Sequence, residues 1–246
     1  MNSVLQIAAE AARKVNEAQA LVTNNLANAG TTAFKADLYA AQTTYLADGT
    51  KDASAIPTTP FSAVDFGGGS LVATGRDLDI AINGQGWMQV MTPQGEQVLS
   101  RRGDLRIENN GNLVDAAGNQ IMGEGGPINL PPASSINIGV DGTISLIPLG
   151  EAPVASATVD RILLVNPNAA NLEKGLDGNI RANANANLEP DAAVTVVVGS
   201  LETSNVNSVA AMVQMIELSR SFESHVKTMQ SADELDDSSA SLMRLE

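Results

Sequence analysis

Hydrophobic positions recur at helical spacing at both ends of the chain. Residues 201–246 contain neither Gly nor Pro, and their apolar side chains return every three or four residues, as on one stripe of a helix. This stripe comprises Val206, Val209, Met212, Val213, Ile216, Phe222, Val226 and Met229. Side-chain oxygens of Ser204, Asn205 or Asn207 can accept hydrogen bonds from the first free N–H groups of a helix. We therefore expect a long C-terminal helix that begins near Val206.

The first 29 residues predict a partner for that helix. They contain neither Gly nor Pro, and their apolar positions step alternately by four and three residues, the a/d pattern of a coiled coil. These positions are Val4, Ala8, Ala11, Val15, Ala18 and Val22. Alanine buries little area but allows two helix backbones to approach closely. We expect the two terminal helices to pair as a coiled coil, with Asn28 or Gly30 as a left-handed cap at the end of the first.

The middle of the chain has a period of two from Leu71 onward, which indicates strands. All ten prolines, and every glycine except Gly30, lie between residues 49 and 199, so turn-forming residues are confined to this region. The predicted strands are 78–82, 87–91, 96–100, 106–108, 113–115, 120–122, 135–140, 143–147, 157–165 and 193–198. Residues 36–70 show little periodicity, and their conformation stays open.

The predicted fold class is α+β, with N- and C-terminal helices paired as a coiled coil and a central all-β domain. The predicted segments are an N-terminal helix over 1–34, an extended connector over 35–70, the all-β domain over 71–200 and the pairing C-terminal helix over 201–246. No apolar run reaches the roughly 18 residues of a membrane span, and no basic leader precedes an apolar block. We therefore expect neither membrane insertion nor a cleaved secretory signal.

Charge and composition narrow the classes of function. The chain has 28 acidic and 14 basic residues, a net charge of −14, whereas nucleic-acid binding requires a basic surface. The absence of cysteine excludes thiolate zinc sites and disulfides without fixing the compartment. We expect no nucleic-acid partner.

Several residues could carry chemistry, but a structural interpretation is favoured for each. His225 is the single histidine and has no identifiable catalytic partner. Asp77 and Asp79 could form a carboxylate pair of the glycosidase kind, yet Arg76 beside them favours a salt bridge. The glycine clusters 67–69 and 123–126 lack the lysine of a phosphate loop and are expected to be turns, and 109–119 lacks the ligand spacing of a calcium loop. The sequence predicts no catalytic residue, no cofactor and no metal.

Motifs at both ends and in the middle resemble the flagellar basal-body rod proteins. They are Asn24-Asn25-Leu26-Ala27-Asn28 with Thr32, Phe34 and Lys35; Thr74-Gly75-Arg76 with Leu78-Asp79 and Ala81-Ile82; Gly84-Gln85-Gly86-Trp87; and Gly199 with Leu201-Glu202, Ser204-Asn205-Val206-Asn207 and Met212. Within the family, the chain is most similar to the proximal rod proteins. Ala33 departs from the family pattern, in which Gly usually precedes Phe34, and Asp77 stands where Pro is frequent.

The resemblance implies a non-enzymatic structural subunit that polymerises through its terminal helices into the axial drive shaft for motility. It also implies export through the flagellar type III apparatus into a rod that crosses the periplasm, with copies of the chain and other proximal and distal rod proteins as partners. The expected assembly interface comprises Val4, Ala11, Val15, Val22, Asn24, Asn25, Leu26, Asn28, Asn205, Val206, Asn207, Val209, Met212, Ile216, Phe222, Val226 and Met229.

Two other functions stay open from the sequence. A distal-rod or hook paralogue differs only in its position along the same axial structure, which periodicity does not resolve. A sugar-binding or hydrolytic β domain on a coiled-coil stalk would require a cleft around Asp77 and Asp79.

Overall fold

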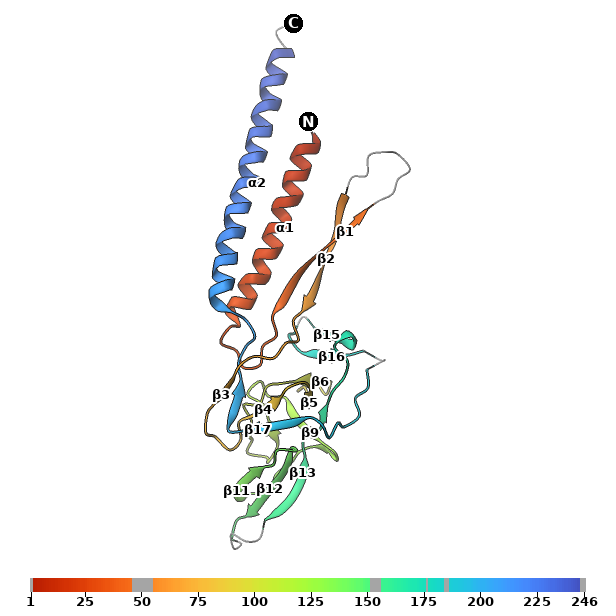
Figure 1. The fold of residues 1–246 in the computed structure, drawn as a ribbon, viewed down its shortest axis with the longest axis vertical. Helices are drawn as coiled ribbons and strands as arrows, with labels where there is room; N and C mark the ends of the chain where they lie inside the picture. Colours follow the sequence, from red (N-terminus) through yellow and green to blue (C-terminus); the bar gives the residue numbers. More distant parts are fainter. Residues whose placement is uncertain (1, 46–54, 151–155, 176, 184–185, 244–246) are drawn as a thin grey trace. The chain divides into compact units, whose positions relative to one another are not determined.

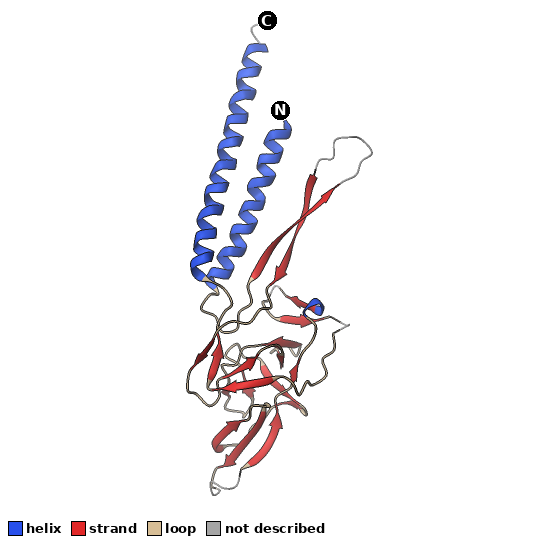
Figure 2. Cartoon of the chain, in the orientation of Figure 1, coloured by secondary structure: helices blue, strands red, loops and turns tan. Residues whose placement is uncertain are grey.

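The chain forms two compact units. The computed structural model describes residues 2–45, 55–150, 156–175, 177–183 and 186–243. One unit, the terminal unit, contains Met1–Ala29, Ala36–Asp65 and Val206–Glu246; the other, the β unit, contains Gly30–Lys35 and Phe66–Asn205. The chain therefore passes between the units after residues 29, 35, 65 and 205. Figure 2 shows the helices of the first unit in blue and the strands in red.

Two long helices dominate the terminal unit. Helix α1 spans Asn2–Ala27 and helix α2 spans Ser208–Met243, and they lie side by side and antiparallel (Figure 1). The expected start of α2 is confirmed to within two residues, and Asn207 caps it by accepting hydrogen bonds from the N–H groups of Val209 and Ala210, both at 3.1 Å. At about 1.5 Å per residue, the ten additional residues of α2 extend it by roughly 15 Å.

The helices pair, but the predicted coiled coil is not what the structure shows. The buried positions of α1 are Ala8, Ala12, Ala18 and Val22, and on α2 only Ala211 is buried among the described side chains. The apolar positions assigned to one stripe of α2 lie on two faces, because at about 100° per residue Val209 and Met229 are roughly 160° apart. Val209 is 70% exposed whereas Met229 is half-buried. Small residues therefore join the helices, with no continuous seam of large ones.

A long hairpin completes the terminal unit. Strand β1 (Asp37–Tyr45) pairs antiparallel with β2 (Ala55–Val64), with a register shift between Ala40 and Gln42. The sequence predicted an extended connector over 35–70 without a definite conformation, whereas this stretch contains two paired strands, and Pro57 and Pro60 both lie in β2.

The β unit contains sixteen short strands among its described residues. They are β3 (Leu71–Ala73), β4 (Ile80–Asn83), β5 (Trp87–Met91), β6 (Gln97–Ser100), β7 (Arg106–Ile107), β8 (Leu113–Val114), β9 (Gln120–Gly123), β10 (Gly126–Pro127), β11 (Ala133–Ile138), β12 (Thr143–Pro148), β13 (Ala157–Arg161), β14 (Leu164–Val165), β15 (Leu172–Lys174), β16 (Ile180–Ala182), β17 (Thr195–Val198) and β18 (Ser200–Glu202). A single 3-10 turn, η1 (Ala169–Asn171), precedes β15.

Antiparallel pairs assemble these strands into one large sheet and three small ones. The large sheet has the order β15-β16-β6-β5-β9-β8-β7, with β10 on β9 and β14 on β5. A three-stranded sheet has the order β11-β12-β13, and the pairs β17-β4 and β18-β3 form two ribbons. Strand β5 matches its predicted bounds, because glycine turns flank a short apolar run; its first four side chains are all buried.

The main core of the β unit packs aliphatic side chains from three sheets: the large one, the three-stranded one and the β17-β4 ribbon. Its fully buried members include Ile80, Met88, Leu113, Ile121 and Ile144. A smaller cluster gathers Trp87, Leu99, Val165, Leu172 and Ile180, with Phe66 packed against it. This smaller cluster forms one wall of the site described below.

The backbone after α1 differs from the expectation of a left-handed cap at Asn28 or Gly30. Ala33 is the only described non-glycine residue with a positive φ, at 56°, and Gly30 is not among the described glycines with positive φ. The left-handed conformation is strained for a residue with a Cβ. Ala33 therefore stands in place of the family's usual glycine at a position where glycine would relieve strain.

Candidate functional site

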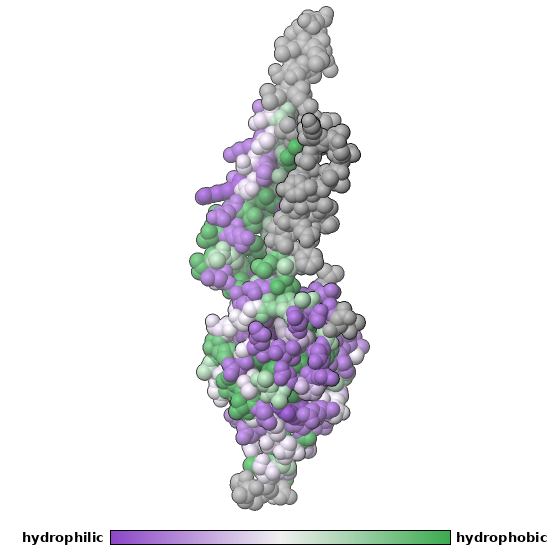
Figure 3. Space-filling model, turned by 45° about the vertical axis from the view of Figure 1, so that its right-hand side comes forward, coloured by the Kyte–Doolittle hydropathy of each residue, from purple (hydrophilic) through white to green (hydrophobic). Residues whose placement is uncertain are grey.

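An apolar face of α2 points to solvent. Val209, Met212, Val213 and Ile216 are 70%, 52%, 51% and 54% exposed, and their spacing of three and four residues places them on one face. Figure 3 shows hydrophobic surface, in green, along the lower part of the helices. We call these four residues the α2 apolar face.

The remaining expected interface residues have several environments. On α1, Val22 is buried, Ala11, Val15 and Leu26 are half-buried, and Asn24 is exposed, while the side chain of Val4 lies outside the described residues. On α2, Phe222 is 38% exposed, Val226 and Met229 are half-buried, and Val206 is half-buried just before the helix. The structure therefore places only part of the predicted set on one exposed surface.

Two of the expected interface asparagines have roles within the chain. Asn25 makes a pair of hydrogen bonds with the backbone of Asp37, donating from Nδ2 to its carbonyl at 2.8 Å and accepting from its N–H at 2.9 Å. This pair attaches the start of β1 to the end of α1. Asn28 donates from Nδ2 to the carbonyl of Asn24 at 3.0 Å, which satisfies an acceptor of the last helical turn.

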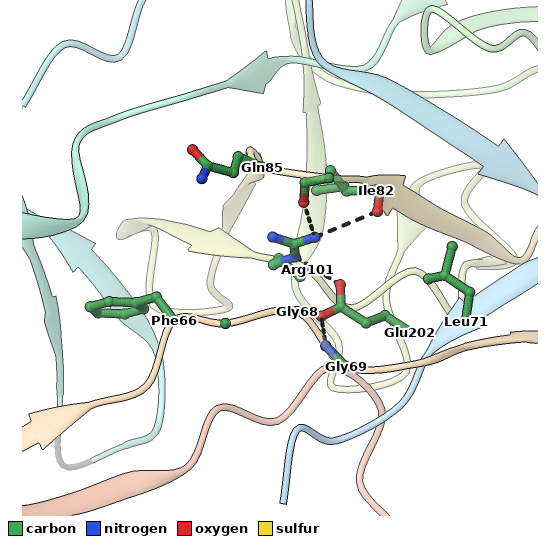
Figure 4. Close-up of a pocket in the computed structure, with 10 residues that line it drawn as sticks. Phe66, Gly68, Gly69, Leu71, Ile82, Gln85, Arg101 and Glu202 are labelled. Carbon is green, nitrogen blue, oxygen red and sulfur yellow. Dashed lines mark hydrogen bonds and ion pairs between the residues drawn. The ribbon is translucent and has the colours of Figure 1, made fainter.

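A buried carboxylate, that of Glu202, holds two cations in the β unit. Glu202 is 1% exposed; its Oε1 lies 2.7 Å from Nζ of Lys35 and its Oε2 lies 2.7 Å from Nε of Arg101. The N–H of Gly69 also donates to Oε1 at 2.8 Å (Figure 4). We call Glu202, Lys35 and Arg101 the buried charge network.

The glycine segment 67–69 allows the backbone to approach the carboxylate of Glu202 closely. A Cβ at Gly69 would overlap the carbonyl oxygen of Thr203, so only glycine fits there. The predicted turn at 67–69 is instead an irregular segment beside β18, and Gly67 accepts a hydrogen bond from Nζ of Lys35 at 2.7 Å. The turn predicted at 123–126 is confirmed, since it joins β9 to β10.

Aromatic rings cover the network. The guanidinium of Arg101 lies 5.7 Å from the ring centroid of Trp87, and Nζ of Lys35 lies 6.0 Å from it. Phe66 meets Trp87 edge to face at 5.9 Å. Cation–π contacts and exclusion of water strengthen the interactions of charges held this way.

The network and its neighbours lie at three of the four places where the chain enters or leaves the β unit. Lys35, Phe66 and Asn205 are the last or first residues of the β unit at three of the four crossings. Lys35 and Glu202 belong to the network, Phe66 packs on Trp87, and Asn205 donates from its N–H to the carbonyl of Phe34 at 3.2 Å. The arrangement therefore fixes the ends of these segments against the β unit.

Two adjoining pockets border the network. A pocket of about 330 Å³ is lined by ten residues that include Phe66, Gln85, Arg101 and Glu202 (Figure 4). The second, of about 590 Å³, shares Phe66, Gln85 and Arg101 and adds Trp87 and the segment around Asn166. Neither pocket is lined by a histidine, cysteine, serine or threonine, and the one carboxylate that lines them, that of Glu202, is paired with Lys35 and Arg101.

The residues weighed for catalysis do not form a catalytic site. Asp77 is exposed in a turn, whereas Asp79 is 2% exposed and lies 3.3 Å from the guanidinium of Arg76, so the two carboxylates do not face one cleft. His225 is half-buried on α2. Within the described ranges there is no cluster of three metal-ligating side chains, and no described helix is long and apolar enough to span a membrane.

The sequence did not reveal the charge network as a unit. Lys35 and Glu202 are separated by 167 positions and Arg101 and Glu202 by 101, so no local pattern links them. Lys35 and Glu202 do lie in the motifs that carry the family resemblance, which was the available signal, but Arg101 lies in none of them.

Family models match the C-terminal end and the middle of the chain, and full-length relatives match nearly all of it. Residues 197–242 match the family model described as flagellar basal body rod FlgEFG protein C-terminal, and residues 81–146 match the flagellar hook protein FlgE/F/G D1 domain. The chain is 33% identical over 240 residues to the flagellar basal-body rod protein FlgF of Escherichia coli (strain K12), covering 95% of both chains. It is 35% identical over 241 residues to FlgF of Salmonella typhimurium, again covering 95% of both. It is 32% identical to the flagellar basal-body rod protein FlgG of Buchnera aphidicola subsp. Schizaphis graminum, covering 87% of this chain and 90% of that one.

Proposed function

This chain belongs to the family of flagellar basal-body rod proteins and is a structural subunit of the rod, and we propose that it polymerises through the α2 apolar face. The family predicted from its motifs is thus confirmed, as is the likeness to FlgF. A distal-rod or hook paralogue is not favoured. The chain associates with copies of itself and with other rod components, and the proposal concerns which surface makes those contacts.

The exposure of four neighbouring apolar side chains supports this choice. Full burial of a Val, Ile or Met side chain contributes roughly 1.5–3 kcal/mol, and these four are each half exposed or more. Covering the face in an assembly would therefore contribute roughly 4 kcal/mol or more per subunit. An apolar helix face of this kind is typical of a protein–protein interface.

The assembled rod provides the neighbours that a lone subunit lacks. We propose that the other expected residues on the same helix, Phe222, Val226 and Met229, act mainly within the chain or at the margin of the interface, since they lie away from the exposed face. Of the predicted interface residues, Val209, Met212 and Ile216 belong to the α2 apolar face. Val213 joins them although the predicted interface omitted it.

We also make proposals about location and chemistry. We propose that the subunit reaches a periplasmic rod through the flagellar type III export apparatus, which the family resemblance implies; the relatives themselves are named as basal-body rod proteins. We also propose that it is non-enzymatic. The relatives are named as rod proteins, and Asp77 and Asp79 have the separate environments described above.

The test is a pair of charge insertions on α2. Ile216→Asp puts a charge on the apolar face, whereas Gln214→Asp puts the same charge two residues away on an exposed position off that face. Each variant is expressed in cells lacking the chromosomal copy, and isolated basal bodies are scored for the variant and for rod length by electron microscopy. We expect Ile216→Asp to abolish incorporation and motility and Gln214→Asp to support both.

Two controls separate assembly from folding. Fluorescence of Trp87, the single tryptophan, reports whether the β unit is intact, and secretion into the medium reports whether export proceeds. Normal incorporation of Ile216→Asp would contradict the proposed surface.

A further inference from the structure

Among the described residues, one arm of the Arg101 guanidinium has no hydrogen-bond partner. The side chain is 5% exposed; its Nε donates to Glu202 at 2.7 Å, and its Nη2 donates to the carbonyls of Gly84 at 2.7 Å and Ile82 at 3.5 Å. Nη1 takes part in none of the hydrogen bonds of the described residues. In Figure 4 this nitrogen points away from Glu202, toward the side on which Phe66 and Gln85 lie.

The larger pocket presents the chemistry that complements an anion. Its walls combine Arg101 with the side-chain amides of Gln85, Asn166 and Asn168 and with the rings of Phe66 and Trp87, and no carboxylate lines it. The three amides lie on exposed residues at its margin, whereas Arg101 lies at its base. A ligand entering this pocket therefore meets amide donors first and a buried cation last.

A carboxylate fits these donors best. Nη1 of Arg101 is not one of the fully buried, unpaired polar atoms of the described residues, so a group that enters the pocket can reach it and accept its hydrogen bond. Guanidinium groups match the planar geometry of carboxylates, and a charged pair in a water-poor site makes the stronger kind of hydrogen bond. At about 590 Å³ the pocket has room for a whole side chain.

We propose that this pocket receives an acidic side chain of the adjacent rod subunit, whose carboxylate binds Nη1 of Arg101. The choice of occupant rests on the proposed function, because only an assembled rod supplies that neighbour. It is supported by the composition of the chain, in which acidic residues outnumber basic ones by 28 to 14, so that copies of it carry a surplus of carboxylates. The contact would connect β units and is separate from the α2 apolar face.

The first experiment measures carboxylate binding by the purified full-length chain. N-acetyl-glutamate α-amide is titrated at constant ionic strength while the fluorescence of Trp87, 5.7 Å from the Arg101 guanidinium, is recorded. N-acetyl-glutamine α-amide, which has the same shape without the charge, is the control ligand. We expect a saturable change with the glutamate probe and an affinity about tenfold or more lower for the glutamine probe, the factor associated with one charge-assisted hydrogen bond.

Two variants of equal charge test the location. Gln85→Glu places an isosteric carboxylate on the pocket wall, where it competes for Arg101, whereas Gln94→Glu adds the same charge in an exposed turn that lines neither pocket. We expect the apparent Kd of the glutamate probe to rise about tenfold or more in Gln85→Glu and to stay unchanged in Gln94→Glu. No saturable binding by the natural chain, or equal effects of the two variants, would overturn the carboxylate site.

The second experiment tests the occupant. Incorporation of Gln85→Glu and Gln94→Glu into basal bodies is compared in cells lacking the chromosomal copy. Reduced incorporation of Gln85→Glu alone supports a neighbour's acidic side chain as the ligand, whereas normal incorporation of both overturns that assignment even if the probe binds. Because Ile216→Asp tests the apolar face and leaves this pocket intact, its result distinguishes failure of the proposed assembly surface from failure of the pocket.

Discussion

Neutralising Glu202 tests the buried charge network most sharply. Glu202→Gln keeps the size of the side chain but removes the negative charge that Lys35 and Arg101 share, both at 2.7 Å. An amide has one oxygen to accept with and an NH₂ that would face a cation donor. The three network side chains are each 5% exposed or less, so water does not replace the lost charge.

The expected loss of stability is large. Removing one partner of a buried ion pair costs about 3–5 kcal/mol, because an uncompensated charge is left in a poorly solvated place. The free energy of unfolding of such domains is about 5–15 kcal/mol, so the variant would lose a substantial share of its stability. The loss should appear in the β unit, to which all three residues belong.

Urea unfolding followed by Trp87 fluorescence measures this loss, since the tryptophan lies beside both cations. Glu96→Gln is the matched control, because Glu96 also lies 2.7 Å from an arginine, Arg181, but on the surface. Exposed ion pairs contribute little to stability, so this variant should unfold close to the natural chain. A Glu202→Gln variant that unfolds at the same urea concentration as Glu96→Gln would refute the reasoning.

The remaining predictions concern the backbone and the surface. Ala33→Gly should stabilise the chain by about 0.5–1 kcal/mol, because it relieves the left-handed strain at φ 56° by more than the added freedom of the unfolded chain costs; an unchanged or lower Tm in calorimetry would oppose this. Hydrogen bonds from Arg181 hold the pKa of Glu96 below 4.5 and the pKa of Asp177 below 3.8. A carboxyl whose pKa is lower in the folded chain than in the unfolded chain stabilises the fold at every pH above its unfolded pKa. This stabilisation is lost as the pH falls through the folded pKa. The Tm of Arg181→Gln should therefore be lower than that of the natural chain at pH 6, and the two values should converge in strong acid. A difference in Tm that stays constant from pH 6 to pH 3 would contradict this linkage.

Local patterns predicted most of the β unit. Short apolar runs and glycine turns predicted the bounds of β5 and came within one residue of those of β9 and β12, because both signals act over neighbouring positions. The hairpin of β1 and β2 shows little periodicity. Its two prolines were part of what predicted an extended connector, although β2 contains both of them.

Features that depend on distant contacts were not predictable in the same way. The helical spacing of α2 predicted the helix correctly. It did not identify the face that packs on α1, because that face is formed by small residues such as the buried Ala211. The candidate site likewise depends on Arg101 and Glu202, which only the folded chain brings together. Local spacing does place Val209, Met212 and Ile216 on one face of α2, and all three are exposed; that this face is an assembly interface stays a prediction.

Solvent access at Ile216 before and after assembly tests the central claim most directly. The chain has no cysteine, so Ile216→Cys introduces a unique thiol on an α2 side chain that is 54% exposed. Its rate of modification by a maleimide is measured in purified subunits and in isolated basal bodies, after confirming that the variant supports motility. We predict rapid labelling of the subunit and at least about tenfold protection in the rod, as burial of the α2 apolar face requires. Equal labelling rates in the two states would show that this face stays open in the rod and would contradict the account.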